Sequence, residues 1–405
     1  MTHPIRFRVV VSHPIQYYVP YYRALAEHSA MDVKALFASR IGLDATHDVE
    51  MGVDISWKTD LLSGYESEFL PEAPTIKTPG FRNIDNPSVT AALDRERPDI
   101  VLLHGYTNLT SLRAIAWCRR KRIPALMISD SSLHIGTGPL TRMAKAVVLP
   151  PLFAQYGGFL SIGDANQRYF ETYGVPKSKI FRVPNMVDEG FWSFRETRQV
   201  TRDRKRAELG LGDDDFVVLF VGKFIARKRP ADLIAALERL KEVNTGRPIK
   251  VLFAGGGELM GSLKSAAQAA GVDASFLGFV NVDELPAIYC AADVLAHPAE
   301  LETFGVIVLE AAILGLPLVL GHRVGAIGPS SIARPDQNAL IHPSGDVATL
   351  ASMLLQLASN PALCASMSLA SLNISRELDW RMSVRGTVDA VAHCLPDRQQ
   401  LQIRT

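Results

Sequence analysis

The sequence lacks a surplus of charge, closely spaced cysteines and any long hydrophobic run. Its 405 residues carry 43 Lys and Arg against 42 Asp and Glu, a formal net charge of +1, whereas a general nucleic-acid binder usually carries a basic surplus. The four cysteines show no C-x-x-C spacing, so neither a zinc site nor a disulfide framework is expected. No run approaches the roughly 18 apolar residues of a membrane-spanning helix, and no signal-peptide pattern opens the chain. The composition therefore indicates a cytoplasmic α/β enzyme or binding protein that does not bind nucleic acid.

What the sequence has is a regular alternation of short apolar runs with stretches of helical periodicity. Strands that alternate with helices predict parallel sheets built from βαβ units. A polar stretch within 184–212 interrupts the pattern and predicts two α/β domains, each wound like a nucleotide-binding fold. The expected strands are Arg8–Ser12, Val33–Ala38, Ile100–His104, Ala125–Ser129, Phe159–Ile162, Val217–Val221, Lys250–Ala254, Val294–His297 and Leu316–Gly321, and clear helical stretches are Ala231–Asn244 and Met260–Ala270.

Two glutamates in ETFGVIVLEAAILGLPLVL (302–320) are spaced to act together. Glu302 and Glu310 are eight residues apart, about 12 Å along a helix, and Gly305 marks where that helix would begin. One carboxylate would then lie at the helix N-terminus and the other two turns along the same side. In a crevice the pair would accept hydrogen bonds from the hydroxyls of a nucleotide sugar. The alternative is an amphipathic helix with two solvated acids.

Two further segments in the second half could meet an anion or a ligand. In VVLFVGKFIARKRP (217–230), Lys223, Arg227, Lys228 and Arg229 follow a buried strand and open a helix, which suits a diphosphate or, alternatively, a solvated turn. In KVLFAGGGEL (250–259), a strand runs into three glycines. Because this is not G-x-G-x-x-G, it predicts no dinucleotide fingerprint, but either a close backbone approach to a ligand or a tight turn.

Taken in order, these segments resemble the family 4 retaining nucleotide-sugar glycosyltransferases of the GT-B fold (glycosyl transferases group 1). The resemblance covers nearly all of the second half, including FLGFV at 276–280, the glutamate segment and NALIHPSGD at 338–346. It reaches back through FLSIGDANQRYFETYGVP at 159–176 and VPNMVD at 183–188. This collinearity favours the paired-glutamate interpretation over the solvated helix.

The resemblance implies an α/β architecture of two Rossmann-like, doubly wound parallel-sheet domains facing a central cleft. Residues 1–185 would bind the acceptor and residues 186–377 the nucleotide-sugar donor, and a C-terminal helix at 378–397 would cross back to the first domain. The implied reaction moves a hexose from a UDP-, GDP- or ADP-sugar to a hydroxyl of a glycan or lipid-linked acceptor, as in polysaccharide biosynthesis. It would proceed with retention through an oxocarbenium-like state, with no obligatory cofactor or metal. Alternatives are a nucleotide-sugar 2-epimerase of the same fold and a non-catalytic sugar-nucleotide-binding protein.

The resemblance also assigns residues in the second domain. Glu310 would bind the donor ribose, Lys228 the diphosphate and Glu302 the transferred sugar. Lys223 stands where the family commonly has arginine, which keeps the charge but not the bidentate fork. Further donor contacts are implied at Gly222, Gly256, Thr303, Phe304 and Gly305, and at Phe279 and Val280, whose backbone would read the nucleobase.

The first domain departs from the family pattern. Where relatives have a glycine-rich loop after the first strand, this chain has VSHPIQYYVPYYRAL at 11–25, so His13, Gln16 and Tyr17 would contact donor or acceptor, or the loop would only pack. Asp130 follows a strand where many relatives carry a histidine; it would orient a sugar hydroxyl or the acceptor, or cap a helix. His104 ends another strand and is either catalytic or structural.

Charge is unevenly distributed along the first domain. From Arg113 to Lys145 there are seven Lys or Arg and one acid, Asp130, and the apolar stretch MAKAVVLPPLFAQY continues from there. A peripheral contact with anionic lipid on the inner face of a membrane would use such a patch. The alternative is a solvated basic surface beside an ordinary core helix.

Overall fold

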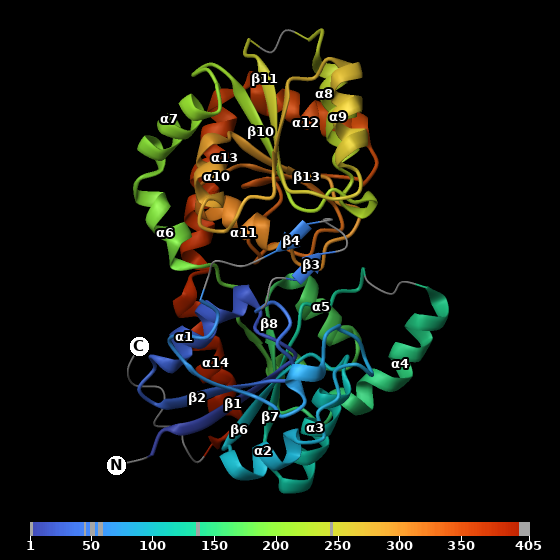
Figure 1. Cartoon of the computed structure of the whole chain (residues 1–405), viewed down its shortest axis with the longest axis vertical. Helices are drawn as coiled ribbons and strands as arrows, with labels where there is room; N and C mark the ends of the chain where they lie inside the picture. The colour runs from blue at the N-terminus through green and yellow to red at the C-terminus, as the bar shows by residue number, and fades with distance from the viewer. Residues whose placement is uncertain are drawn as a thin grey trace. The chain divides into compact units, whose positions relative to one another are not determined.

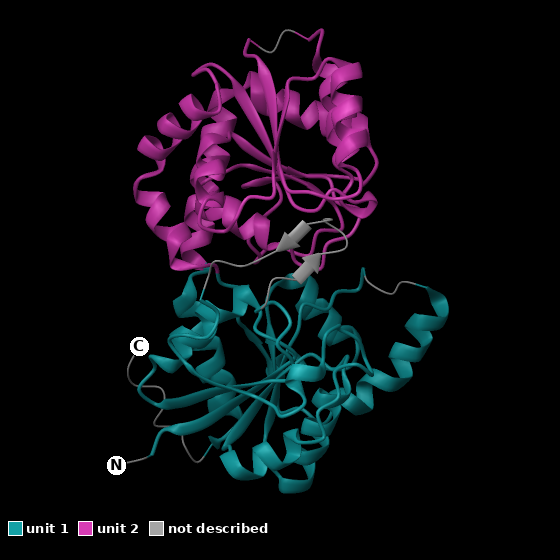
Figure 2. Cartoon of the chain, in the orientation of Figure 1, with its two compact units in different colours: residues 1–46, 59–186, 378–405 teal, residues 47–58, 187–377 magenta. Residues whose placement is uncertain are grey.

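The computed structural model describes residues 3–43, 46–48, 53–55, 60–134, 138–243 and 246–396. The chain divides into two compact units, which Figure 2 shows in different colours. Unit 1 comprises residues 1–46, 59–186 and 378–405, and unit 2 comprises residues 47–58 and 187–377. The segment 47–58, expected in the first domain, is thus grouped with unit 2. Asn244 and Asp397, the last residues of two expected helices, lie outside the described residues.

Unit 1 is built on a seven-stranded parallel sheet in the order β5-β2-β1-β6-β7-β8-β9 (Figure 1). Strands β6, β7 and β8 are almost wholly buried, as expected for parallel strands covered on both faces. The strands are β1 Ile5–Val11, β2 Met31–Phe37, β5 Glu66–Phe69, β6 Ile100–His104, β7 Ala125–Ile128, β8 Gly158–Ser161 and β9 Ile180–Arg182. The helices are α1 Val19–Ala26, α2 Val89–Glu96, α3 Leu109–Lys121, α4 Pro139–Phe153, α5 Asp164–Thr172 and α14 Trp380–Cys394. Two short strands, β3 Thr46–Asp48 and β4 Val53–Ile55, pair with each other.

Unit 2 is built on a six-stranded parallel sheet in the order β12-β11-β10-β13-β14-β15 (Figure 1). Its first strand, β10, has the sequence FVVLFV and is buried at every residue, because helices and core side chains cover both faces. The strands are β10 Phe216–Val221, β11 Ile249–Ala254, β12 Ala274–Gly278, β13 Val294–His297, β14 Leu318–Gly321 and β15 Ala339–His342. The helices are α6 Glu189–Glu196, α7 Arg198–Glu208, α8 Pro230–Leu240, α9 Met260–Ala270, α10 Leu285–Ala291, α11 Val306–Ile313, α12 Val347–Ser359 and α13 Pro361–Glu377.

Both sheets reverse their strand order beside their first strand. In unit 1 the chain builds outward from β1 through β2 and then returns to place β6 on the other side of β1. In unit 2 it builds outward from β10 through β11 and β12 and then places β13 on the other side of β10. At such a switch point the loops after the two neighbouring strands diverge and leave a crevice beyond the carboxyl ends. Binding residues are therefore expected after β1 and β6 in unit 1, and after β10 and β13 in unit 2.

The last helix, α14, belongs to unit 1, where it packs against α1, β8 and β9. The Tyr21 hydroxyl lies 2.7 Å from the Thr387 hydroxyl, and the Ser383 hydroxyl donates to the Pro184 carbonyl at 2.8 Å. Gly386 allows α14 to approach the backbone of β9 very closely, because a Cβ at this residue would lie 2.0 Å from the carbonyl oxygen of Arg182. These contacts fix α14 against the sheet of the first unit.

Within the described ranges, no single helix is long and apolar enough to cross a membrane. Val347–Ser359 and Pro361–Cys394 reach that length and apolar character only when they are taken together, and they are bent by 99° relative to each other.

Candidate functional site

The switch point of unit 2 brings a lysine and a glutamate together. Lys228 ends a short 3-10 turn (η4, Ala226–Lys228) in the loop after β10, and Glu302 lies in the loop after β13. The Lys228 ammonium donates directly to Glu302 Oε2. Both side chains are largely shielded from water, at 14% and 15% exposed. The pair therefore occupies the position where the strand order predicts a ligand crevice.

A buried histidine lies beneath this pair. His297 ends β13, is 0% exposed, and places Nε2 3.4 Å from Glu302 Oε2. Neither of its ring nitrogens has a hydrogen-bond partner in the described part of the chain. Burial lowers the pKa of His297, so its ring is neutral near pH 7. Sequence reasoning missed this residue; its only signal was a histidine at the carboxyl end of an expected strand.

The surroundings of Glu302 keep it ionised. Burial alone would raise its pKa, but the contact with His297 and the positive charge of Lys228 outweigh burial and hold the pKa at about 2. Glu302 is thus a carboxylate across the whole physiological pH range. Such a group accepts hydrogen bonds from hydroxyls and does not donate a proton.

The two glutamates are not arranged as the spacing predicted. Glu302 lies outside helix α11, in an extended segment that bridges to Val324, and the helix begins only at Val306. Gly305 caps it with a left-handed φ of 90°, a conformation that a glycine adopts without strain. Glu310 lies in the second turn of α11. The helix start expected at Gly305 is confirmed, but Glu302 precedes the helix, so the expected rise of about 12 Å along one helix does not separate the two glutamates.

Glu310 is held by a tyrosine that sequence reasoning also missed. The hydroxyl of Tyr289, on α10, donates to Glu310 Oε2 at 2.7 Å, and Tyr289 is 0% exposed. Burial raises the pKa of Glu310 to about 7, against the opposing effect of this hydrogen bond. The solvated-helix alternative for the two acids is therefore wrong. Glu302 and Glu310 share one motif but have pKa values pushed in opposite directions.

The glycine-rich loop after β11 packs tightly against the loop after β10. A Cβ at Gly255 would lie 1.9 Å from the Gly222 carbonyl oxygen, and one at Gly257 would lie 2.6 Å from the Phe224 carbonyl oxygen. The Phe224 amide donates to the Gly256 carbonyl at 2.7 Å. Gly255 and Gly257 are therefore required for packing between two backbone segments. The ligand contacts expected at Gly222 and Gly256 remain predictions.

The other expected donor residues follow the carboxyl ends of the strands of unit 2. Lys223 comes two residues after β10, and Phe279 and Val280 come directly after β12. Thr303 and Phe304 continue the segment that contains Glu302, and the Phe304 carbonyl accepts from the Ala326 amide at 3.0 Å. One basic residue of the 217–230 segment has a partner within unit 2, since the Arg229 guanidinium pairs with the Asp232 carboxylate at 2.6 Å.

In unit 1 the switch point brings His13 and His104 near each other. His13 follows β1 and has its Nδ1 2.8 Å from the Ser12 hydroxyl. His104 ends β6, with Nε2 2.7 Å from the Tyr22 hydroxyl and its ring edge-on to Tyr18. Burial and then the nearby His13 lower the pKa of His104 to about 3, so the ring stays neutral. His104 therefore has a structural partner, and its catalytic role remains a prediction.

The remaining candidates of unit 1 surround the same loops. Gln16 and Tyr17 lie in a short 3-10 turn (η1, Gln16–Tyr18) that leads into α1. Asp130 follows β7 and is close enough to Tyr18 for its charge to raise the pKa of that phenol, after burial and Tyr17. The helix-capping alternative for Asp130 is wrong, because α4 begins at Pro139 with Gly138 as its N-cap.

The basic segment of unit 1 is partly neutralised. Arg113 pairs with Asp85 and Lys121 with Asp94, each at 2.6 Å. Helix α4 contains no acid, and several of its apolar side chains are exposed while Leu149 and Phe153 are buried. The exposed ones are Leu140 at 80%, Met143 at 67%, Val147 at 74% and Val148 at 59%.

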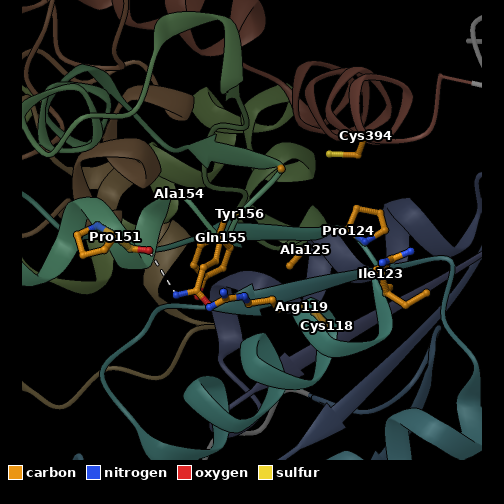
Figure 3. Close-up of a pocket in the computed structure, with 12 residues that line it drawn as sticks. Cys118, Arg119, Ile123, Pro124, Ala125, Pro151, Ala154, Gln155, Tyr156 and Cys394 are labelled. Carbon is orange, nitrogen blue, oxygen red and sulfur yellow. Dashed lines mark hydrogen bonds between the residues drawn. The ribbon is translucent and has the colours of Figure 1, made fainter.

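A cavity of about 760 Å³ lies elsewhere in unit 1 (Figure 3). Its lining includes Arg119 and Arg122 at the end of α3, and Pro124 and Ala125 at the start of β7. It is therefore at the amino ends of the strands, opposite the carboxyl ends where the candidate residues gather. In the described ranges no three His, Cys, Asp or Glu side chains form a cluster that could hold a metal ion.

Two family models together match most of the chain. The model for Glycosyl transferases group 1 matches residues 201–371, which contain Lys228, Glu302 and Glu310. The model for Glycosyltransferase Family 4 matches residues 56–191. Glycogen synthase of Mycobacterium tuberculosis is 27% identical over 327 residues, covering 75% of this chain and 74% of that protein. An uncharacterized glycosyltransferase of Methanocaldococcus jannaschii is 36% identical over 153 residues, covering 36% of this chain and 37% of that protein.

Solved structures share the fold over nearly the whole chain. Anabaena HepE in complex with UDP matches with a TM-score of 0.73 at 15% identity, over 96% of this chain and 99% of that one. Sucrose-phosphate synthase from Thermosynechococcus elongatus matches with a TM-score of 0.68 at 15% identity, over 99% and 100% of the two chains. The two parallel sheets and these neighbours identify the fold as GT-B. The chain belongs to the group 1 glycosyltransferases of family 4.

Proposed function

We propose that this protein is a retaining glycosyltransferase that moves a hexose from a nucleoside-diphosphate sugar to a hydroxyl of a glycan or glycolipid acceptor. The observation that supports this most directly is the pairing of Lys228 with an ionised Glu302 at the switch point of unit 2. A cation suited to a diphosphate and a carboxylate suited to sugar hydroxyls are next to each other there. Residues 186–377 would bind the donor, and residues 1–185 the acceptor.

Each group in unit 2 has a role in this proposal. Lys228 and Lys223 bind the diphosphate, Glu302 accepts hydrogen bonds from the transferred hexose, and Glu310 accepts hydrogen bonds from the ribose. The backbone at Thr303, Phe304 and Gly305 contacts the sugar and the diphosphate. The backbone at Phe279 and Val280 contacts the nucleobase. Gly222 and Gly256 allow the donor to approach the backbone closely. His13, Gln16, Tyr17, His104 and Asp130 would contact the acceptor or the reacting sugar.

The chemistry assigned to these residues is charge stabilisation. As the bond between the sugar and the diphosphate breaks, negative charge grows on the leaving phosphate and positive charge on the sugar ring. Lys228 stabilises the first and the carboxylate of Glu302 favours the second, in surroundings that exclude much of the water. The leaving diphosphate takes the proton of the incoming hydroxyl on the same face of the sugar. This step uses no metal ion and no enzyme nucleophile.

The donor is found by a ligand screen. HepE has been crystallised with UDP and with UDP-glucose, which supports a nucleoside diphosphate as the ligand class. Thermal unfolding should be followed with UDP, GDP and ADP, because a ligand of the folded state raises the melting temperature by mass action. Transfer is then measured from the matching sugar nucleotide to an acceptor. Product formed without any acceptor would instead indicate an epimerase, and binding without turnover would indicate a non-catalytic protein.

We further propose that unit 1 contacts an anionic membrane surface through helix α4. Leu140, Met143 and Val147 are spaced i, i+3 and i+7, so they share one face, and this face is exposed. The helix is anchored in the unit near its C-terminal end, by the buried side chains of Leu149 and Phe153. An apolar outward face on a helix without acids suits insertion among anionic headgroups. The protein would then be cytoplasmic and peripheral to the inner face of the membrane.

Vesicle sedimentation tests this contact. The wild-type protein should sediment with vesicles containing phosphatidylglycerol and much less with pure phosphatidylcholine. The double variant Met143→Asp, Val147→Asp should lose this binding, whereas Val200→Asp, at another exposed apolar residue (75% exposed), should keep it. Equal sedimentation of the α4 variant and the wild type would contradict the proposal.

A further inference from the structure

His297 is a buried polar side chain that the proposed mechanism does not yet use. It is 0% exposed, and in the described residues neither Nδ1 nor Nε2 has a hydrogen-bond partner. Buried polar groups are nearly always paired, and an unpaired one carries a desolvation cost. An unpaired N–H at the carboxyl end of a central strand therefore requires an explanation, and its neighbours provide one.

The carboxylate oxygen that faces Nε2 of His297 already accepts a hydrogen bond from another residue. Nε2 lies 3.4 Å from Glu302 Oε2, which is longer than the roughly 2.7–3.2 Å of a formed N–H···O bond. The same oxygen accepts from the ammonium of Lys228. Behind the ring lies Phe220, with its centroid 6.0 Å away, so Lys228 and Glu302 are the charged groups that act on His297. The carboxylate thus lies between a lysine that donates to it and a histidine that makes only a long contact with it.

Binding of a diphosphate changes this balance. Lys228 cannot give its full charge to both Glu302 and a diphosphate, which carries more negative charge than a carboxylate. When Lys228 turns to the diphosphate, Glu302 loses its counter-charge while it is still shielded from water. A buried carboxylate whose partner is removed is strongly destabilised unless other donors replace that partner. The hydroxyls of the sugar supply donors on one side, and His297 is the available donor on the other.

We propose that His297 is a positioning residue, whose Nε2–H takes over Glu302 when Lys228 engages the donor diphosphate and so holds the carboxylate against the transferred sugar. This inference rests on the proposed function, because it needs Glu302 to contact the sugar and Lys228 to contact the diphosphate. It predicts that His297 contributes to recognition of the sugar and not of the nucleoside diphosphate. A residue that only fills the core would affect both ligands alike.

The test compares the two ligands in variants of His297. The wild type is first screened with UDP and UDP-glucose, GDP and GDP-mannose, and ADP and ADP-glucose, and the pair that binds is used in calorimetric titrations. His297→Leu should leave the affinity for the nucleoside diphosphate within about twofold and lower that for the sugar nucleotide by roughly tenfold or more. It should also reduce kcat. His297→Gln, whose amide nitrogen can replace Nε2, should recover most of both losses.

A matched control is available in the same sheet. His342 is also buried, at 1% exposed, and ends the strand β15, but its surroundings are Asp232, Asp346 and His322 rather than Glu302. His342→Leu should leave the preference for the sugar nucleotide unchanged. If His297→Leu fails to fold, His297→Gln is compared with His297→Asn, whose amide nitrogen matches Nδ1. The Gln variant should then keep the preference and the Asn variant should lose it.

Three outcomes would overturn the inference. His297→Leu could keep the wild-type preference for the sugar nucleotide while melting at a lower temperature, which would assign His297 to packing alone. His297→Gln could behave like His297→Leu, which would exclude donation from the Nε2 position. The wild type could bind none of the six nucleotides, in which case the proposed function itself fails, and that result is distinct from the other two.

Discussion

At the scale of single residues, burial and neighbouring charge shift the pKa values of the two glutamates of the 302–320 segment in opposite directions. Glu302 is held ionised by its neighbours, with a pKa of about 2, although burial opposes this. Among the described residues, no cation contributes to the pKa of Glu310, and burial raises it to about 7. Neutral Glu310 can donate as well as accept, whereas Glu302 only accepts. The sequence identified both residues but could not distinguish their environments, because His297 and Tyr289 come from other segments.

The raised pKa of Glu310 predicts a stability cost at high pH. Its folded-state pKa exceeds the ordinary value of 4.5, so the folded state retains the proton longer and loses stability as pH rises from about 4.5 through 7. Glu310→Gln lacks this loss and should be more stable than the wild type at pH 8, on the order of 1–3 kcal/mol, but equally stable near pH 4.5. Urea unfolding at the two pH values measures the difference. The exposed Glu238→Gln on α8 is the control, and an equal gain there at pH 8 would refute the explanation.

Glu302 should show the opposite pH dependence. Its folded-state pKa is below 4.5, so its contribution to stability is present above about pH 4.5 and is lost as pH falls from there toward 2. Glu302→Gln also leaves Lys228 shielded and unpaired, so it should destabilise the protein at pH 7 by on the order of 3 kcal/mol. The difference from the wild type should shrink as the pH is lowered toward 3. Urea unfolding along that series would contradict the assignment if the difference did not depend on pH.

At the scale of elements, the loops after β10 and β11 form one interlocked unit at the carboxyl edge of the second sheet. Gly255 adopts a left-handed φ of 147° and lies against the Gly222 carbonyl. Sequence reasoning placed three glycines there but left open whether they approach a ligand or form a turn. The structure shows a third reason, close packing between the two loops, which depends on strand order and is not encoded locally.

Alanine substitutions test this packing. Gly255→Ala should lower the unfolding free energy by on the order of 3 kcal/mol, because its Cβ would lie 1.9 Å from a carbonyl oxygen and the φ is unfavourable. Gly261→Ala, in the first turn of α9 with no atom within 4 Å of the new Cβ, should be neutral or stabilise by up to about 1 kcal/mol. Equal stabilities of the two variants in chemical denaturation would show that the loops are not closely packed.

The pattern of the sequence predicted the central strands well and the edge strands poorly. Buried strands such as β6 and β13 are found at the expected residues, because continuous apolar runs are distinctive. Strands β5, β9 and β12 lie at or near the sheet edges, are only partly buried, and were not predicted. Their alternating or mixed sequences resemble loops. The start of helix α11 was predicted better, because Gly305, the residue expected to mark it, is the N-cap of the helix.

At the scale of the whole molecule, the chain forms two units, and its C-terminal helix belongs to the first. The family resemblance, and not any periodicity, led to the expectation that the last helix crosses back. In the structure, α14 contacts β8 and β9 and is fixed by Thr387, Ser383 and Gly386. The boundaries of the compact units, at 186/187 and 377/378, lie next to those expected from the sequence. The assignment of donor and acceptor to these units remains a proposal.

A substitution in α14 should affect unit 1 selectively. Gly386→Val would force its side chain against the Arg182 carbonyl, so we expect the calorimetric transition of unit 1 to move to lower temperature. The transition of unit 2 should remain, and the nucleoside diphosphate should still raise it. Arg385→Ala, at the exposed neighbouring residue, should change neither transition. A single transition that shifts as a whole would show that the two units unfold together.

The proposed function depends on the binding of a nucleoside diphosphate to unit 2 through Lys228. Calorimetric titration of the wild type, Lys228→Ala and the exposed-lysine control Lys241→Ala with the nucleoside diphosphate found in the screen tests it most directly. We expect the wild type and Lys241→Ala to bind alike, and Lys228→Ala to bind at least roughly tenfold more weakly, because it loses a charge-assisted contact. Unchanged affinity of Lys228→Ala would show that Lys228 does not bind the diphosphate.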